Sequence, residues 1–263
     1  PSSRSFASFM EVTVDKHDAL KGVPSIRLLH TSDLHLDSLE SCDLLRDVIN
    51  TANSHAVDLM VIAGDFFDNT RVGQDTLEKS LEYLDGLEMP LVILPGNHDQ
   101  LDDHSIYHRF DLSVVRSDVR LITELNGEQI LFPELGLGVW GRAMEEHTLD
   151  FHPLDGAPSR GDLPFQVGLG HGFHFHPGEM IDRASPILPS EIESTKYDYI
   201  GLGHVHVFRD VSAGNVRAFY SGAPDPVRFP KPGPGDAAVV TLEYGTQAVI
   251  EVVPVLEAVR REE

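Results

Sequence analysis

Cysteine, lysine and long apolar runs are scarce in this chain of 263 residues, and each scarcity excludes a class of protein. The single cysteine, Cys42, excludes an intrachain disulfide and a cysteine-based zinc site, and it fits a buried residue in a reducing, cytoplasmic compartment. The apolar stretches 59–63 and 91–94 are far shorter than the roughly 20 residues that span a bilayer, so no membrane helix is expected. Residues 1–24 carry charges where a signal peptide needs an apolar run, so we expect a flexible leader or an expression remnant and no secretion.

Positive charge is also scarce. The chain has 20 basic residues, only five of them lysine, against 42 acidic ones, and its formal net charge is −22. A uniformly anionic surface repels nucleic acid, whose binding normally depends on clusters of lysine and arginine. Composition alone therefore argues against a DNA-binding protein. The proportions of hydrophobic residues (41%) and charged residues (24%) are those of a folded globular protein, and the length fits one large α/β domain over residues 25–263.

Short apolar runs alternate with amphipathic helical segments, which is the pattern of parallel strands buried on both faces. The sequence predicts helices at 41–55 and 75–87. It predicts strands at 26–30, 58–63, 91–94, 119–123, 129–132, 137–140, 165–170, 197–202, 216–220, 237–243 and 249–253. The last three strands are expected to form an antiparallel meander, interrupted by a loop rich in proline and glycine at 223–236.

Five of the predicted strands end in the same way, with an apolar run, a turn and then residue types that bind metals. The residues that follow these strands are Asp33 and His35; Asp65 and Asp68; Asn97, His98 and Asp99; His171; and His204 and His206. Residues two apart in an extended segment point the same way, so each Asp-x-His or His-x-His pair can reach one place. Open α/β sheets place their sites at the carboxyl ends of the strands. The five clusters are therefore predicted to converge on one edge.

The predicted cluster contains carboxylates, imidazoles and an amide but no thiolate, which suits divalent manganese, iron, zinc or nickel. The number of residues favours two ions with a bridging ligand. We assign the ligands as Asp33, His35 and His206 for one ion, Asn97, His171 and His204 for the other, and Asp65 between them. Two ions roughly 3.5 to 4 Å apart activate water and stabilise phosphoryl oxygens during displacement at phosphorus. His98 is then free to protonate the leaving oxygen, with Asp68 holding its other ring nitrogen.

The motifs Asp-x-His, Gly-Asp-x-x-Asp, Gly-Asn-His-Asp, a histidine after a strand and Gly-His-x-His occur here in order. With them the chain resembles the calcineurin-like metallophosphoesterase superfamily over about residues 26–253. The segments most similar to the SbcD-type DNA repair exonucleases are 30–37, 58–68, 95–99, 197–206 and 220–224. The resemblance implies a four-layer α/β/β/α sandwich with two mixed sheets, and a dinuclear site, usually active with manganese, that hydrolyses phosphoester bonds. It implies the same ligand set and a pair formed by Asp68 and His98.

SbcD-type nucleases carry a DNA-contacting capping domain after the phosphoesterase core, whereas this sequence ends soon after its last predicted strand. We therefore expect a single domain over 25–263 with no separate capping domain, and a partner subunit could supply DNA contacts. A phosphodiesterase acting on DNA is the main hypothesis. A small-molecule phosphodiesterase or phosphomonoesterase is the alternative, and an inactive scaffold of the same fold is a third. Arg142 and Arg228 are candidate contacts for a substrate phosphate.

Several other residues receive a structural interpretation. His30 lies inside a strand and is interpreted as a core histidine, and Asp99 as a cap of its loop. His174 and His176 remain alternatives to His171 as a ligand. Two bound cations would form a local positive centre, and distant surface carboxylates are screened beyond about 8 to 10 Å at physiological salt. The net charge therefore does not exclude a phosphodiester substrate.

Overall fold

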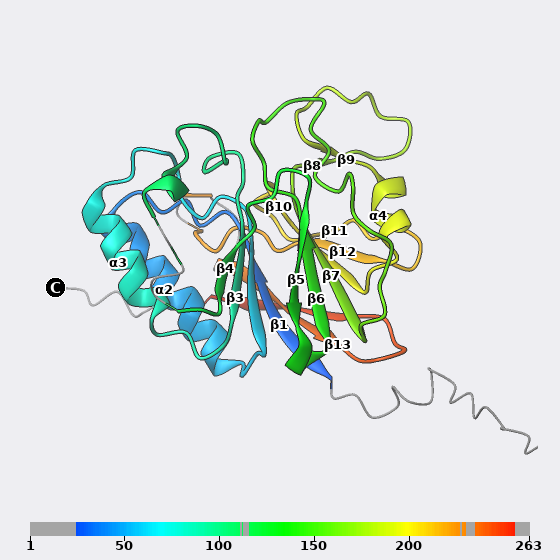
Figure 1. Cartoon of the computed structure of the whole chain (residues 1–263), viewed down its shortest axis with the longest axis horizontal. Helices are drawn as coiled ribbons and strands as arrows, with labels where there is room; N and C mark the ends of the chain where they lie inside the picture. The colour runs from blue at the N-terminus through cyan, green and yellow to red at the C-terminus, as the bar shows by residue number, and fades with distance from the viewer. Residues whose placement is uncertain (1–24, 111, 113–115, 227, 230–234, 256–263) are drawn as a thin grey trace, which may run out of the picture.

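Two six-stranded mixed sheets lie face to face in the structure, a computed structural model that describes residues 25–110, 112, 116–226, 228–229 and 235–255 (Figure 1). The predicted leader and part of the 223–236 loop lie outside the described residues. Two helices cover the outer side of the first sheet, and one short helix with irregular segments covers that of the second, which is consistent with the four-layer prediction. The fold prediction is confirmed.

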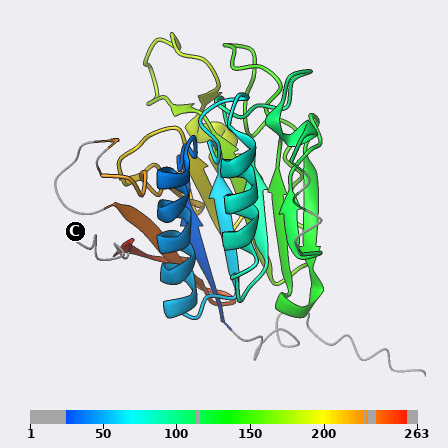
Figure 2. The same ribbon diagram turned by 90° about the vertical axis from the view of Figure 1, so that its left-hand side faces the viewer.

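The first sheet has the strand order β14-β13-β1-β2-β3-β4. Its parallel part comprises β1 (Ile26–Thr31), β2 (Leu59–Ala63), β3 (Leu91–Leu94) and β4 (Val119–Leu121). Its antiparallel edge comprises β13 (Asp236–Leu242) and β14 (Val249–Pro254). The helices that connect the parallel strands are α2 (Leu39–Ser54) and α3 (Gln74–Leu84), and both lie over the same face of the sheet (Figure 2).

The second sheet has the strand order β11-β12-β10-β7-β6-β5. Its strands are β5 (Glu128–Phe132), β6 (Leu137–Gly141), β7 (Phe165–His171), β10 (Tyr199–Gly203), β11 (Arg209–Asp210) and β12 (Arg217–Tyr220). A small separate pair joins β8 (Phe173–His174) to β9 (Pro186–Ile187). The remaining short elements are α4 (Pro189–Thr195) and the 3₁₀ turns η1 (Ile106–His108) and η3 (Pro133–Leu135).

The expected C-terminal meander is wrong for its first strand. β12 pairs in parallel with β10 in the second sheet, whereas β13 and β14 pair with each other in the first sheet. The loop at 223–236 therefore connects two different sheets. Three short apolar runs in succession carry no signal that tells one sheet from the other, so sequence proximity was a poor guide to pairing here.

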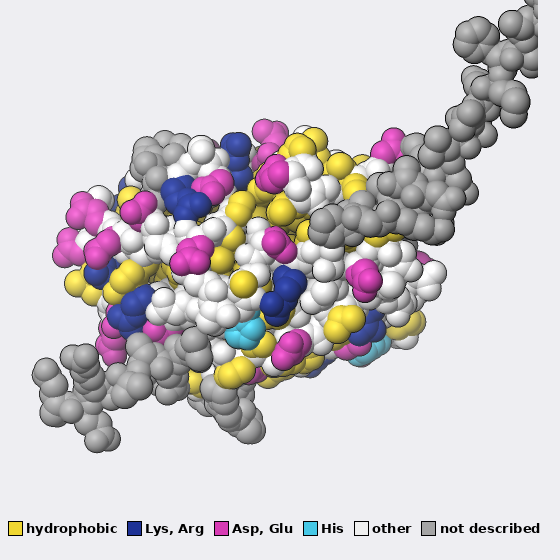
Figure 3. All heavy atoms as spheres, turned by 90° about the horizontal axis from the view of Figure 1, so that it is seen from below, with side chains coloured by type: hydrophobic (Ala, Val, Ile, Leu, Met, Phe, Trp, Pro, Cys, Tyr) yellow, Lys and Arg dark blue, Asp and Glu magenta, His cyan; other side chains and the backbone are white. Residues whose placement is uncertain are grey.

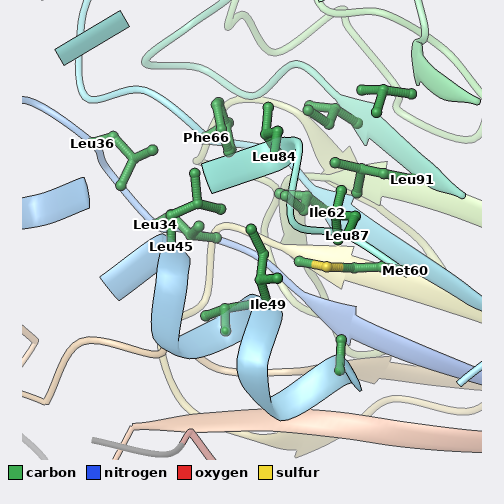
Figure 4. Close-up of a cluster of buried hydrophobic side chains, with 14 of the residues drawn as sticks. Leu34, Leu36, Leu45, Ile49, Met60, Ile62, Phe66, Leu84, Leu87 and Leu91 are labelled. Atoms are coloured by element: carbon green, nitrogen blue, oxygen red, sulfur yellow. The ribbon is translucent and has the colours of Figure 1, made fainter. Parts of the chain in front are cut away.

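Side-chain alternation along the first sheet divides its residues between two cores. Leu29, Met60 and Ile62 pack under the helices, together with Leu45 and Ile49 of α2 (Figure 4). Their neighbours in sequence point to the other face, where Leu28, Val61 and Val92 pack against the second sheet. This period of two is that of strands buried on both faces. The apolar core between the two sheets holds them face to face, so the loops at their carboxyl ends can meet.

The outer face of the second sheet is covered less regularly. Within the described part of the chain, α4 is the only α-helix on that side, and irregular segments complete the layer around a third apolar cluster that includes Ile192 and Tyr197. The face at the opposite end from the strands' carboxyl ends carries acidic, basic and apolar side chains interspersed (Figure 3). None of the helices among the described residues has the length and apolarity that crossing a bilayer requires.

Candidate metal centre

Four of the predicted ligands stand on backbone that non-glycine residues rarely adopt. The φ angle is 57° at Asp33, 49° at His35, 53° at Asp65 and 92° at His204. Each such position costs of order 1–3 kcal/mol and persists only where the surroundings fix it. All four follow the carboxyl ends of β1, β2 and β10. The strain is therefore concentrated where the predicted ligands lie.

Hydrogen bonds between the loops hold this backbone. The amide of Asp33 donates to the carbonyl of Gly64 at 3.0 Å, and that of His35 to the carbonyl of Asp65 at 3.0 Å. The amide of His204 donates to the Asp33 carboxylate, at 3.1 Å from each oxygen. These bonds connect the end of β1 to those of β2 in the same sheet and β10 in the other. The ligand-bearing loops are thus joined across both sheets.

The first predicted ligand trio is brought together. One ligand atom from each of Asp33, His35 and His206 lies within 4.8 Å of the others. Asp33 is completely buried and His35 nearly so, while the His206 side chain is 35% exposed. An ion at this position could therefore be reached from solvent on the His206 side.

The second trio lies beside the first. The Asn97 side-chain oxygen is 2.9 Å from Nε2 of His171 and 2.9 Å from Nδ1 of His204. Oδ2 of Asp65 lies between the trios, 3.6 Å from Nε2 of His35 and 3.4 Å from Nε2 of His171. All seven predicted ligands therefore meet at the junction of the two sheets. Their ligand atoms also form other close groups, Asp33 with Asp65 and His171, and His35 with Asp68 and His98, so the division into two trios stays a prediction.

Two glycines are required for this approach. A Cβ on Gly64, whose φ is +95°, would lie 2.0 Å from Nδ1 of His171. A Cβ on Gly96 would lie 2.2 Å from Oδ1 of Asp65. Real Cβ atoms do not come this close to other heavy atoms, so any side chain here would displace His171 or Asp65.

The buried charges of the site balance one another. Burial raises the pKa of the Asp65 carboxyl, but His171 and His35 outweigh this and hold its pKa well below the usual range. Asp33 responds in the same direction, because His206 and His171 outweigh its burial and lower its pKa. Burial lowers the pKa of His171, but Asp65 more than reverses this and raises it to about 9. Both carboxylates are thus ionised in a buried place, where positive charge is favoured.

The chemistry of the donors fits divalent cations. Burial lowers the pKa of His35 and brings that of His204 to about 4, so both imidazoles are neutral, as metal ligands must be. His171, whose pKa Asp65 raises, would have to release its proton for a bound cation. Nε2 of His35 is buried and, among the described atoms, has no hydrogen-bond partner. An unpaired buried nitrogen facing a carboxylate is costly unless a ligand satisfies it. The donors are oxygen and nitrogen only, which suits manganese, iron or zinc.

His98 and Asp68 adjoin the centre, but their contact differs in part from the prediction. Nδ1 of His98 donates to the main-chain carbonyl of Asp68 at 2.8 Å and lies 3.5 Å from its Oδ1. That carboxylate oxygen instead accepts from Nδ1 of His35 at 3.0 Å and from the guanidinium of Arg228. Burial raises the pKa of Asp68, but Arg228 outweighs it and lowers the pKa. Asp68 therefore holds His98 through its backbone and His35 through its side chain.

The two predicted arginines occupy different surroundings. Arg228 lies at the site, where it contacts Asp68 and Asp37 and donates to the carbonyl of His35. Arg142 donates to the carbonyls of Leu125 at 2.7 Å and His152 at 3.2 Å. Its guanidinium thus joins two loops instead of lying among the ligands.

The structural interpretations of other polar residues are confirmed. His30 is completely buried, with Nδ1 2.8 Å from the hydroxyl of Tyr199 in the facing sheet. The Asp99 carboxylate accepts from the amides of Gly96, Phe66 and Phe67 and so caps its loop. Cys42 is buried.

Sequence reasoning missed several residues around the centre. The ring of His147 lies 5.2 Å from that of His204, and its Nδ1 is 2.8 Å from the hydroxyl of Ser185. Ser32 donates to the Asp33 carboxylate and lies 3.2 Å from the hydroxyl of Ser221. His147 follows β6 as the predicted ligands follow their strands, and that signal could have revealed it. Nothing in the sequence distinguishes Ser32.

Solved structures of other proteins share this fold. A protein of Thermus thermophilus, TT1561, superposes with a TM-score of 0.60 at 11% identity, covering 89% of this chain and 100% of its own. Purple acid phosphatase PPD1 of yellow lupin gives 0.55 at 11% identity, covering 88% of this chain and 52% of its own. A dimetal phosphatase of Danio rerio gives 0.52 at 12% identity, covering 86% of this chain and 98% of its own. At these identities the likeness shows the fold alone.

A comparison of the sequence with protein families identifies the family of this chain. Residues 26–208 match the model of the family described as Calcineurin-like phosphoesterase. The match covers most of the chain and contains every strand end at which the candidate ligands lie. The chain therefore belongs to the calcineurin-like phosphoesterases, a family of metal-dependent hydrolases.

Proposed function

We propose that this chain is a dinuclear, metal-dependent phosphodiesterase of the nuclease type, with manganese as its metal. The observation that carries the proposal is the meeting of seven side chains, Asp33, His35, Asp65, Asn97, His171, His204 and His206, in two trios joined by Asp65. Bound there, the two ions would supply a water nucleophile and neutralise phosphoryl oxygens. The similarity of the motifs to SbcD-type exonucleases favours DNA as substrate, and this substrate stays a prediction.

His98 is the proposed proton donor to the leaving oxygen. Its Nδ1 donates to the Asp68 carbonyl, so Nε2 is the nitrogen left to exchange a proton with the substrate. The side chain is 43% exposed, more than those of the buried ligands beside it. Its ring lies 4.6 Å from the ring of His35, a residue of the first trio, and this closeness supports the proposed role. The Asp68 carboxylate, itself held by Arg228, positions the His35 ring.

Electrostatics supports a phosphodiester as the substrate. Two divalent cations with the two ligand carboxylates of Asp33 and Asp65 and one hydroxide leave a single positive charge, which matches one negative phosphodiester. Arg228 adds a cation at the rim, although two aspartates already contact it. With both ions bound, a molecule whose net charge is −22 would therefore present a local positive centre to the substrate.

The test compares Asp65→Asn and His98→Ala with the unchanged chain in hydrolysis of bis(p-nitrophenyl) phosphate with manganese. We expect Asp65→Asn to reduce both bound metal and activity to background. His98→Ala should lower kcat by about 10²- to 10⁴-fold, the usual size of proton-transfer catalysis, without reducing bound metal. His104→Ala removes an exposed histidine outside the cluster and serves as the matched control. Unchanged hydrolysis in both site variants would overturn the mechanism.

A second assay distinguishes the diesterase from its alternatives. Single-stranded DNA, a cyclic nucleotide and p-nitrophenyl phosphate are compared at equal concentration with the manganese-loaded chain. Cleavage of DNA supports the nuclease. Turnover of the monoester alone would replace the proposal with a phosphomonoesterase, and full metal loading without turnover of any ester would indicate an inactive scaffold.

A further inference from the structure

A half-buried phenylalanine stands beside the second trio. The ring of Phe173 lies 6.5 Å from that of His204, with the two planes nearly perpendicular at 85°. The guanidinium of Arg183 lies over the Phe173 ring, 4.4 Å from its centroid. The ring also packs edge-on against the buried Phe175, with centroids 5.4 Å apart, but it remains partly exposed. Aromatic rings and arginine planes are both surfaces on which proteins stack unpaired bases.

The backbone under Phe173 is fixed. Its amide donates to the carbonyl of Ser185 at 3.0 Å, and the carbonyl of Gly172 accepts from the hydroxyl of Tyr220 at 2.8 Å. A Cβ on Gly172 would lie 2.1 Å from the Ser185 carbonyl oxygen, so the two segments are in close contact. The short pair of β8 and β9 carries this contact beyond the carboxyl ends of the second sheet (Figure 1). Phe173 is thus held at a set distance from His204.

Arg183 also differs from the other arginine at the site. Among the residues that the structure describes, Arg183 takes part in no salt bridge, whereas Arg228 contacts both Asp37 and Asp68. Arg183 is exposed as well. In a chain with twice as many acids as bases, a stacked arginine without an acidic partner is available to a ligand.

The other aromatic ring at the centre has a different place. Phe229 packs on His206 with ring centroids 3.8 Å apart and on His35 at 5.0 Å. It therefore supports two candidate ligands directly. The larger separation between Phe173 and His204 leaves Phe173 free of that task.

We propose that Phe173 and Arg183 form a stacking subsite for a nucleobase carried by the ester group of the substrate, on the His204 side of the centre. The inference rests on the proposed phosphodiesterase function and adds a specificity-determining pair to it. The base stacks on the Arg183 guanidinium or the Phe173 ring, while its phosphate lies at the two trios. No bond forms or breaks at this subsite.

The experiment uses two esters with the same leaving group, thymidine 5′-(p-nitrophenyl phosphate) and methyl p-nitrophenyl phosphate, and the manganese-loaded full chain. Stacking is worth about 1–3 kcal/mol per base, so Phe173→Ala should raise KM for the thymidine ester about five- to hundredfold with kcat retained. KM for the methyl ester should not change. Phe173→Trp should restore the thymidine KM, and Arg183→Ala should raise it. Arg217→Ala is the matched control, because Arg217 also stacks on a phenylalanine, Phe219, at 4.8 Å, but within β12.

Calorimetric binding of thymidine 5′-monophosphate and 2-deoxyribose 5-phosphate gives a readout that does not depend on turnover. Phe173→Ala should weaken only the nucleotide. If neither ester is hydrolysed but this selective loss is seen, the subsite stands and the phosphodiesterase proposal fails. If both esters are hydrolysed and Phe173→Ala alters neither KM, or both equally, the subsite is overturned. A fall in kcat on both esters would also overturn it, because Phe173 would then only support His204.

Discussion

The two sheets contribute different chemistry to the same centre. The loops after β1 and β2 in the first sheet carry the carboxylates Asp33, Asp65 and Asp68, whereas the loops after β7 and β10 in the second carry only histidine ligands. The carboxylate ligands of the first sheet and the histidine ligands of the second are thus apart until the two sheets pack together. Neither sheet alone holds either complete trio together with Asp65. The contact between the sheets is therefore as much a part of the site as its ligands.

The sheets also differ in what covers them. Two helices, of 16 and 11 residues, cover the first sheet, and one helix of 7 residues lies on the outer side of the second. The shorter covering of the second sheet leaves room for β8, which carries Phe173, and for the irregular segments that carry His147 and Arg183. We therefore expect the second sheet to determine which substrate binds. The first sheet is expected to supply the ionised ligands.

The largest effect is expected where one sheet's backbone touches the other sheet's ligand. Gly64→Ala places a Cβ at positive φ and against the His171 ring. Left-handed strain and overpacking together should lower the free energy of unfolding by about 2–5 kcal/mol. Displacement of His171 should also reduce phosphoesterase activity by at least about 100-fold. Urea denaturation, metal content and hydrolysis of bis(p-nitrophenyl) phosphate measure the three effects.

Gly73→Ala is the matched control for this change. Gly73 precedes α3, and a Cβ there meets nothing within 4 Å. We expect its activity to match the unchanged chain. Because Gly73 is the N-cap of α3, where alanine is disfavoured, its stability should fall by no more than about 1 kcal/mol. Equal behaviour of the two alanine variants would show that contact between the sheets at Gly64 does not fix His171.

A smaller effect, visible through pH, tests the contact between the sheets away from the ligands. Burial lowers the pKa of His30 to about 3, while an unfolded histidine titrates near 6.5. Between these values the unfolded chain binds the proton and the folded chain does not. The stability due to neutral His30 is thus fully present above about pH 6.5 and is lost as the pH falls toward 3.

His30→Gln removes this titration and keeps an acceptor for the Tyr199 hydroxyl. From pH 7 to pH 5 the unchanged chain should lose about 2 kcal/mol of unfolding free energy relative to the variant. Urea titrations at both values measure the difference, with His104→Gln as an exposed control. Parallel pH profiles for the unchanged chain and His30→Gln would contradict a buried, neutral His30.

The smallest effect separates the two arginines that the sequence singled out. Arg228→Ala removes the cation that holds Asp68, the partner of His35, and should lower kcat about tenfold, as loss of a group behind a ligand does. Its stability should change by less than about 1 kcal/mol, because the ion pair is partly exposed. Arg142→Ala should leave kcat unchanged, since its guanidinium joins the 125 and 152 loops. A similar kcat in both variants would contradict the proposal that Arg228 supports the site and Arg142 does not.

Much of this organisation is present in the sequence because it is local. Strand ends such as those before Asp33, Asp65 and His204 combine an apolar run with a turn, and each was located to within a few residues. The helix α4 and the pair of β8 and β9 are too short to show a period. The sheet to which β12 belongs depends on packing between distant segments, and so does the place of Phe173 beside His204. No window of sequence contains that information.

The bond between the His204 amide and the Asp33 carboxylate joins residues 171 positions apart. At about 5–20 residues per second of synthesis, roughly ten to thirty seconds pass between the addition of the two residues. During that interval the ribosome carries a nascent chain with the carboxylates in place and the last two histidines still untranslated. Because His204 and His206 follow β10, neither predicted trio can be complete before that strand has been synthesised.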